Sequence, residues 1–388
     1  MKQNEYKYGV KKLSGLSKVE SQKRIRRHLI RYAAALKKEA TGKYVIVFMD
    51  ESYIHQGYCA KRTWYCAATS SRVVPNRVKG SEKGKRLIVI HAMTKFGLLE
   101  LPTVTDEDCE NLEQEKPSAA VVTSKLSAEG FEPEDYHDTL DGPKFVAWMR
   151  NRLFPAFEKL FPKKKMILVL DNAKYHHARG DDFYSPAKMN RGQCADFLRQ
   201  TNYKTITGEV RGTVKTYRSS QFSLDERDGG PTLGLLRKTV KEYLSSHPQI
   251  NQTIPQQLMA DKGYELLYTP PYESWLQPIE LVWARMKQRV ARQSDAARKW
   301  QETQAQTLEA LRAFTPKDCS KIIGHVHKWM TEWLGGPEAG SLSRFKTLQA
   351  LMAATKKELN QLADVAVEDG VEVPDVDAEK RDQESVAA

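Results

Sequence analysis

The sequence predicts an α/β fold, and three observations support this prediction. Short apolar, β-branched runs at 44–50, 63–69, 86–93 and 166–170 are typical of strands. Apolar residues recur at helical spacing in 144–160 and 279–290, which predicts amphipathic helices between and after those strands. A chain of 388 residues, 40% of them hydrophobic, is also long enough to bury a core without disulfide support.

The first half of the chain predicts a basic helix followed by strands. Residues 1–43 hold thirteen Lys or Arg against three Glu, concentrated in 23–31, and we expect one helix at about 18–38. Three strands at 44–50, 63–69 and 86–93 then suggest a meander. The helix at 144–160 contains Pro155, which predicts a kink or break before the strand at 166–170.

The second half predicts mostly helices and ends in an acidic segment. Residues 178–231 are rich in Gly, Arg, Asp and Ser, which predicts mostly loop with short elements. A helix at 235–244, a short strand at 266–268, a helix at 279–290 and two helices within 298–335 follow. The last thirty-one residues carry ten acids against two bases, which predicts a disordered tail.

Composition excludes several classes of protein. The longest apolar runs are far shorter than the ~20 residues of a membrane span, and the N-terminus lacks the pattern of a secretory signal. The five cysteines are scattered without a Cys-x-x-Cys pair, which argues for a reducing compartment and against a zinc site. We therefore expect a soluble protein of the nucleus, or of the cytoplasm if the source is not eukaryotic. The net charge of +12 indicates a polyanionic partner.

Three carboxylates stand where catalytic acids are often found. Asp50 and Asp171 each end a buried apolar run, and Glu280 follows Pro278 in the first turn of a predicted helix. Taken singly, each acid has an ordinary alternative role as a turn residue, a helix cap or a partner of the helix dipole. Taken together, they suit in-line phosphodiester chemistry, which uses two hard divalent ions ~3.5–4 Å apart bound by carboxylate oxygens.

The sequence around these acids resembles a known family. The blocks are Asp50-Glu51-Ser52, then 168–176 with Asp171-Asn172 and His176, then 270–283 with Pro278, Glu280 and Trp283. In this order they resemble the DDE domain of mariner-like transposases over residues 44–292. The resemblance implies a ribonuclease H-like fold, a mixed sheet of five strands flanked by helices, with an insertion before the last catalytic helix. It also implies that Asp50, Asp171 and Glu280 are the catalytic residues and hold two Mg²⁺ or Mn²⁺ ions.

The chain departs from that family pattern in three places. Ser274-Trp275-Leu276-Gln277 replaces the usual aspartate and asparagine positions before the third acid. The segment between Asp171 and Glu280 is longer than in compact members. Only 43 residues precede the first strand, too few for a paired helix-turn-helix module. The expected organisation is a basic helical segment at 1–43, a catalytic domain at 44–295 with an insertion at about 178–262, C-terminal helices at 296–355 and an acidic tail at 356–388.

The expected function is that of a transposase or endonuclease core that cuts and joins DNA, with transposon ends and target DNA as partners. A homodimer is left open as the active arrangement. One alternative is an inactive or domesticated DNA-binding derivative, and another is a nuclease of this fold acting on an RNA–DNA hybrid. Asn172 and His176 are expected beside the metal site or the substrate. Basic candidates for DNA contact, each with a solvated helix face as the alternative, are Lys23, Arg24, Arg26, Arg27, Arg31 and Lys287.

Overall fold

The computed structural model describes residues 18–59, 84, 86–99, 118–123, 140–180, 183–210, 212–294, 298–354 and 358. These fall into two compact units. The core unit holds the described residues up to His177 and from Leu258 onward, and the inserted unit holds Ala178–Gln257. The expected strand at 63–69 and most of the expected acidic tail lie outside the described residues. No helix among the described residues is both long and apolar enough to cross a membrane.

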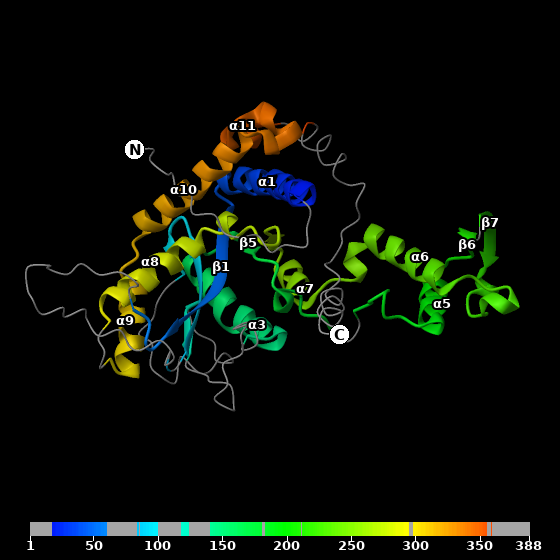
Figure 1. Ribbon diagram of the computed structural model, residues 1–388, viewed down its shortest axis with the longest axis horizontal. Coiled ribbons are helices and arrows are strands. Elements are labelled where there is room, and N and C mark those ends of the chain that lie inside the picture. Colours follow the sequence, from blue (N-terminus) through cyan, green and yellow to red (C-terminus); the bar gives the residue numbers. More distant parts are fainter. Residues whose placement is uncertain are drawn as a thin grey trace, which may run out of the picture. The chain divides into compact units, whose positions relative to one another are not determined.

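A mixed sheet forms the centre of the core unit (Figure 1). Its strands follow the order β3-β2-β1-β5-β8, and β4 also pairs with β2. The strand β1 is antiparallel to β2 and parallel to β5, which is in turn parallel to β8. This order and these directions confirm the expected ribonuclease H-like fold. The strands are β1 (Tyr44–His55), β2 (Arg86–Thr94), β3 (Gly97–Leu98), β4 (Val121–Thr123), β5 (Lys165–Leu170) and β8 (Glu265–Tyr268).

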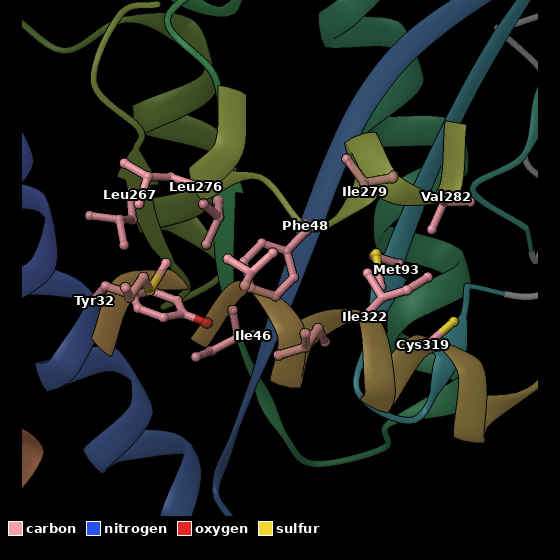
Figure 2. Packing of buried hydrophobic residues seen from close by; sticks show 14 of the residues in the cluster. Tyr32, Ile46, Phe48, Met93, Leu267, Leu276, Ile279, Val282, Cys319 and Ile322 are labelled. Atoms are coloured by element: carbon pink, nitrogen blue, oxygen red, sulfur yellow. The ribbon is translucent and has the colours of Figure 1, made fainter. Parts of the chain in front are cut away.

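Helices cover both faces of this sheet. Successive side chains of a strand point to opposite faces, and those of the central strands are apolar on each face. Ile46 and Phe48 of β1 belong to one hydrophobic cluster, and Val45 and Val47 belong to the other. The first cluster includes residues of α1, α8 and α10, as the close view of Tyr32, Ile279 and Ile322 around Phe48 shows (Figure 2). The second includes residues of α3 and α4. The helices are α1 (Lys18–Ala40), α3 (Gly142–Trp148), α4 (Phe154–Leu160), α8 (Ile279–Arg292), α9 (Trp300–Arg312), α10 (Pro316–Leu334) and α11 (Leu348–Ala353).

Two predicted helices show how local sequence shapes this packing. The helix expected at 144–160 is interrupted by a π-helical turn at Met149–Leu153, directly before Pro155. Proline lacks an N–H and clashes with the preceding turn, so the expected break is confirmed with a physical cause. The basic helix α1 buries Ile25, Leu29 and Tyr32 against the first cluster, so it is part of the core unit.

The inserted unit has its own small core. Helix α5 (Arg191–Gln200) and helix α6 (Leu233–Ser246) pack with a hairpin of β6 (Thr205–Val210) and β7 (Thr213–Arg218). Helix α7 (Ile254–Asp261) begins in this unit and ends in the core unit, where Met259 belongs to the second cluster. Residues 178–231 were expected to be mostly loop with short elements, and the short elements are α5, β6 and β7. Asn190 and Gln193 form a reciprocal cap that starts α5, and Phe197 anchors that helix in the unit's core.

Candidate active site

Asp50 lies on the central strand at the point where its pairing changes. The strand β1 pairs with β5 from Tyr44 to Phe48, and with β2 from Phe48 to His55. Asp50 therefore lies two residues beyond the last β5 pair, where a neighbouring loop and helix can approach it. Its side chain is only 7% exposed, and Trp283 of α8 donates a hydrogen bond from Nε1 to Asp50 Oδ2 at 3.0 Å.

Asp171 occupies the equivalent position beside β5. The last register pair is Phe48 with Val169, so Asp171, like Asp50, stands two residues further along its strand. Ile167 and Val169 face the same cluster as Ile46 and Phe48, and strand alternation gives Asp50 and Asp171 that same face. Parallel register therefore brings together two acids that are far apart in the sequence.

Glu280 approaches the same face on helix α8. The helix begins after Pro278, whose fixed φ suits a helix start. The preceding residue, Gln277, is buried and donates from Nε2 to the carbonyl oxygen of Val169 at 3.3 Å, which ties the helix start to β5. Ile279 and Trp283 bury the other side of this first turn, so Glu280 is held on a fixed part of the helix.

The charges of these acids act on one another. Burial raises the pKa of Asp50 well above its usual value, and the negative charges of Glu51, Glu280 and Asp171 raise it further, while the Trp283 hydrogen bond opposes them. Partial loss of hydration also raises the pKa of Glu280 although its side chain still reaches solvent; Lys287 opposes this shift, and Asp171 and Glu51 add to it. The four carboxylates thus form one electrostatic group.

This group fits divalent cations by its chemistry. All of its donors are carboxylate oxygens, which Mg²⁺ and Mn²⁺ prefer, and bound cations would offset the mutual repulsion that raises the pKa of Asp50. In the described part of the chain, no set of three or more His, Cys, Asp or Glu side chains is arranged to hold a metal ion as it stands.

His176 holds Asp171 in place. Its ring is fully buried, Nδ1 lies 2.6 Å from Asp171 Oδ1, and the Phe145 ring packs against it at 4.4 Å. Burial lowers the pKa of His176, but the charge and hydrogen bonds of Asp171, together with Glu51, outweigh burial and raise it. The same Asp171 oxygen accepts a hydrogen bond from the backbone N–H of Ala173 at 3.0 Å. The contacts with His176 and Ala173 hold the Asp171 carboxylate in one position.

Asn172 has a different neighbour. Its Oδ1 lies 2.6 Å from Nε2 of His177, whose ring stacks on Tyr268 at 4.4 Å. The contact joins the turn after β5 to the end of β8. Asn172 therefore stabilises the turn after β5. His176 instead contacts Asp171, a candidate metal-binding residue, directly.

The basic candidates separate into two groups. Lys287 lies two turns beyond Glu280 on the same face of α8. Its charge acts on Asp50 and Glu280, and its Nζ lies 4.9 Å from the centre of the Tyr53 ring. The others lie on α1: Lys23 and Arg31 are exposed, Arg24 pairs with Glu20 at 2.9 Å, and Arg26 donates to the Glu338 carbonyl at 2.9 Å. Arg27 is half-buried on the same helix.

Sequence reasoning missed two members of the site. Trp283 was interpreted only as part of an apolar stripe, yet its indole N–H reaches Asp50. Glu51 was quoted only as a neighbour of Asp50, yet it is 2% exposed and raises the pKa of Asp50, His176 and Glu280. The adjacent acid pair was a signal for Glu51; no sequence signal pointed to the indole contact.

Comparison with known families adds one finding about the third acid. Residues 236–302 match the family model described as DDE superfamily endonuclease. Residues 236–302, called the DDE segment below, are thus similar to DDE superfamily endonucleases. The DDE segment contains Glu280, Trp283 and Lys287, and it confirms the resemblance expected from the sequence at the level of this superfamily. Asp50 and Asp171 lie outside it, and their assignment rests on the geometry above.

Three of the solved structures similar to this chain are described as structures of the Mos1 transposase. The "Mos1 transposase paired-end complex with left transposon end" has 14% identity and a TM-score of 0.43, covering 84% of this chain and 64% of that chain. The "Mos1 mariner paired end complex with Mn" has 14% identity and a TM-score of 0.44, with the same coverage. The "Mos1 transposase catalytic domain and Raltegravir with Mg" has 11% identity and a TM-score of 0.39, covering 82% and 94%. The chain thus spans 64% of the length of the first two. No curated protein matches it.

Proposed function

We propose that this chain is the catalytic part of a DDE-type DNA transposase, an endonuclease that cuts and rejoins DNA phosphodiesters with two divalent cations. The observation that carries the proposal is that Asp50, Asp171 and Glu280 form one electrostatic group. The parallel register of β1 and β5 puts Asp50 and Asp171 at equivalent positions on neighbouring strands. Glu280 lies in the DDE segment. The net charge of +12 supports a polyanionic substrate. Transposon ends and target DNA are the substrates that the proposal assigns.

The carboxylates divide the metal-binding work between them. Asp50 and Asp171 would share one Mg²⁺ or Mn²⁺, and Glu280 would hold the second. When bound, the two cations would lower the pKa of an attacking water or hydroxyl and stabilise charge on the leaving oxygen. His176 keeps the Asp171 carboxylate in one orientation, and Trp283 does the same for Asp50. These contacts fix the ligands before substrate arrives, which limits reorganisation during reaction.

The proposed reaction has two balanced steps. In hydrolysis, the oxygen of water bonds to phosphorus, the P–O bond to the DNA 3′-oxygen breaks, and a 3′-hydroxyl and a 5′-phosphate result. In joining, that 3′-hydroxyl attacks a target phosphodiester, and the target strand leaves through its own 3′-oxygen. No covalent bond to the protein forms. Lys287, whose charge acts on Glu280 and Asp50, would contact a DNA phosphate.

Nicking of supercoiled plasmid tests this proposal. Wild-type protein with Mn²⁺ at fixed low salt should convert supercoiled to open circular DNA, and Asp171→Asn should abolish the conversion. Asp261→Asn is the matched control, because Asp261 is an exposed aspartate at the end of α7. Plasmid left intact by folded wild type with Mn²⁺ and with Mg²⁺ would contradict the proposal and favour a DNA-binding derivative without catalysis.

A further inference from the structure

A rigid loop connects the two halves of the candidate active site. It runs from the end of β8 to the start of α8. At its first end, the backbone N–H of Thr269 donates to the carbonyl of Leu170, the residue before Asp171, at 2.8 Å. At its other end, Gln277 donates to Val169 at 3.3 Å. Pro270 and Pro271 restrict the backbone between these anchors.

The middle of this loop is also fixed. Glu273 is only 4% exposed, and its carboxylate accepts hydrogen bonds from Ser21 Oγ of α1 at 2.6 Å and from Trp275 Nε1 at 2.8 Å. A buried carboxylate is costly unless such donors satisfy it, so these bonds hold the loop in one conformation. Tyr272 directly precedes this anchored residue in the loop.

Tyr272 combines an unfavourable backbone with an exposed ring. Its φ is 63°, in the left-handed region where a bulky side chain is disfavoured and glycine is not. The residue is 59% exposed, so solvent reaches the ring. Strained residues held by a rigid frame occur preferentially at ligand-binding sites. The loop carries Tyr272 between the strand end at Asp171 and the helix start at Glu280.

We propose that Tyr272 is a base-stacking residue, which takes the face of an unpaired nucleobase next to the phosphodiester at the active site. The inference rests on the proposed function for its substrate class. Every base offers a π-face, so stacking on tyrosine tolerates any sequence and positions a strand whose end must be separated from its partner. The rigid loop sets the distance from the stacked base to the carboxylates.

Fluorescence of a base analogue tests the inference. The probe is a DNA duplex with a one-base overhang of 2-aminopurine, bound by the full chain in Ca²⁺ to prevent turnover. Stacking should quench the fluorescence with wild type and with Tyr272→Phe. Tyr272→Gly should lose the quenching and bind this probe about 5- to 150-fold more weakly. Because glycine relieves the backbone strain, the same variant should unfold at an equal or higher temperature than wild type.

Control variants and a second readout keep the outcomes separate. Phe96→Ala removes another exposed aromatic, on the β2–β3 turn, and should quench like wild type. Quenching by Tyr272→Gly equal to that of wild type would overturn the inference, and so would the absence of quenching by wild type. Plasmid nicking reports on the proposed function independently, so nicking that persists without any Tyr272 effect would remove this inference and leave that function standing.

Discussion

Replacing Trp283 by Phe removes one hydrogen bond from a buried carboxylate and leaves most of the aromatic packing in place. The bond from Nε1 to Asp50 Oδ2 is 3.0 Å long, and Asp50 is 7% exposed, so water replaces the lost donor poorly. Hydrogen bonds to charged groups contribute about 1.5–3 kcal/mol. The metal affinity and the nicking rate at subsaturating Mn²⁺ should therefore fall about 10- to 100-fold.

The assay is a Mn²⁺ titration with two readouts, plasmid nicking and thermal unfolding. Metal that binds the folded state raises the unfolding temperature, and Trp283→Phe should require about 10- to 100-fold more Mn²⁺ for the same rise. Trp148→Phe is the matched control, since Trp148 is also fully buried and donates from Nε1, to the Ala119 carbonyl at 2.9 Å. Both variants should lose stability without metal, because each loses a buried hydrogen bond, but Trp148→Phe should keep the Mn²⁺ dependence of wild type. Identical Mn²⁺ dependence in wild type and Trp283→Phe would refute the role assigned to the indole.

Three further predictions concern stability. Burial lowers the pKa of both His28 and His327 to about 4, so below pH 6.5 the unfolded chain gains protons that the native state excludes. The free energy of unfolding, measured in urea, should therefore fall by about 1.5 kcal/mol for each of these histidines between pH 6.5 and 5. An unchanged value would contradict their burial. Leu29→Ala should lower the free energy of unfolding by about 2–5 kcal/mol in the same assay, because this fully buried leucine packs α1 against the core unit. A change near zero would show that α1 is not packed there. Gly230→Ala would place a Cβ 1.9 Å from the Leu224 carbonyl oxygen and should lower the thermal stability of the inserted unit. Gly234→Ala, within α6, should instead stabilise this unit by about 0.5–1 kcal/mol. Equal effects of the two variants in thermal unfolding would contradict the loop geometry.

The sequence was most informative where a residue ends a buried run. Asp50 and Asp171 both follow apolar β-branched stretches, and Glu280 follows a helix-start proline, so candidate acids could be found from local pattern alone. Their proximity could not, because it depends on the parallel register between β1 and β5 and on the docking of α8. The family resemblance supplied that information before the structure did.

In α1, the basic residues of the sequence drew attention away from the apolar residues between them. The run of Lys and Arg in α1 suggested an exposed helix, but Ile25, Leu29 and Tyr32 recur at helical spacing and pack into the core. In the inserted unit, high polarity suggested loop, although the short cap at Asn190 was enough to start a helix. The contacts of Trp283 and His176 depend on side-chain direction in three dimensions, which periodicity does not encode.

The most direct test of the central claim is the number of Mn²⁺ ions bound per chain in the presence of a DNA end, measured by titration with detection of free Mn²⁺. If Asp50, Asp171 and Glu280 hold the ions together, wild type should bind two, and Asp50→Asn, Asp171→Asn and Glu280→Gln should each bind fewer. Glu158→Gln, which alters an exposed acid paired with Lys262, should match wild type. Equal binding by wild type and all three site variants would contradict the account.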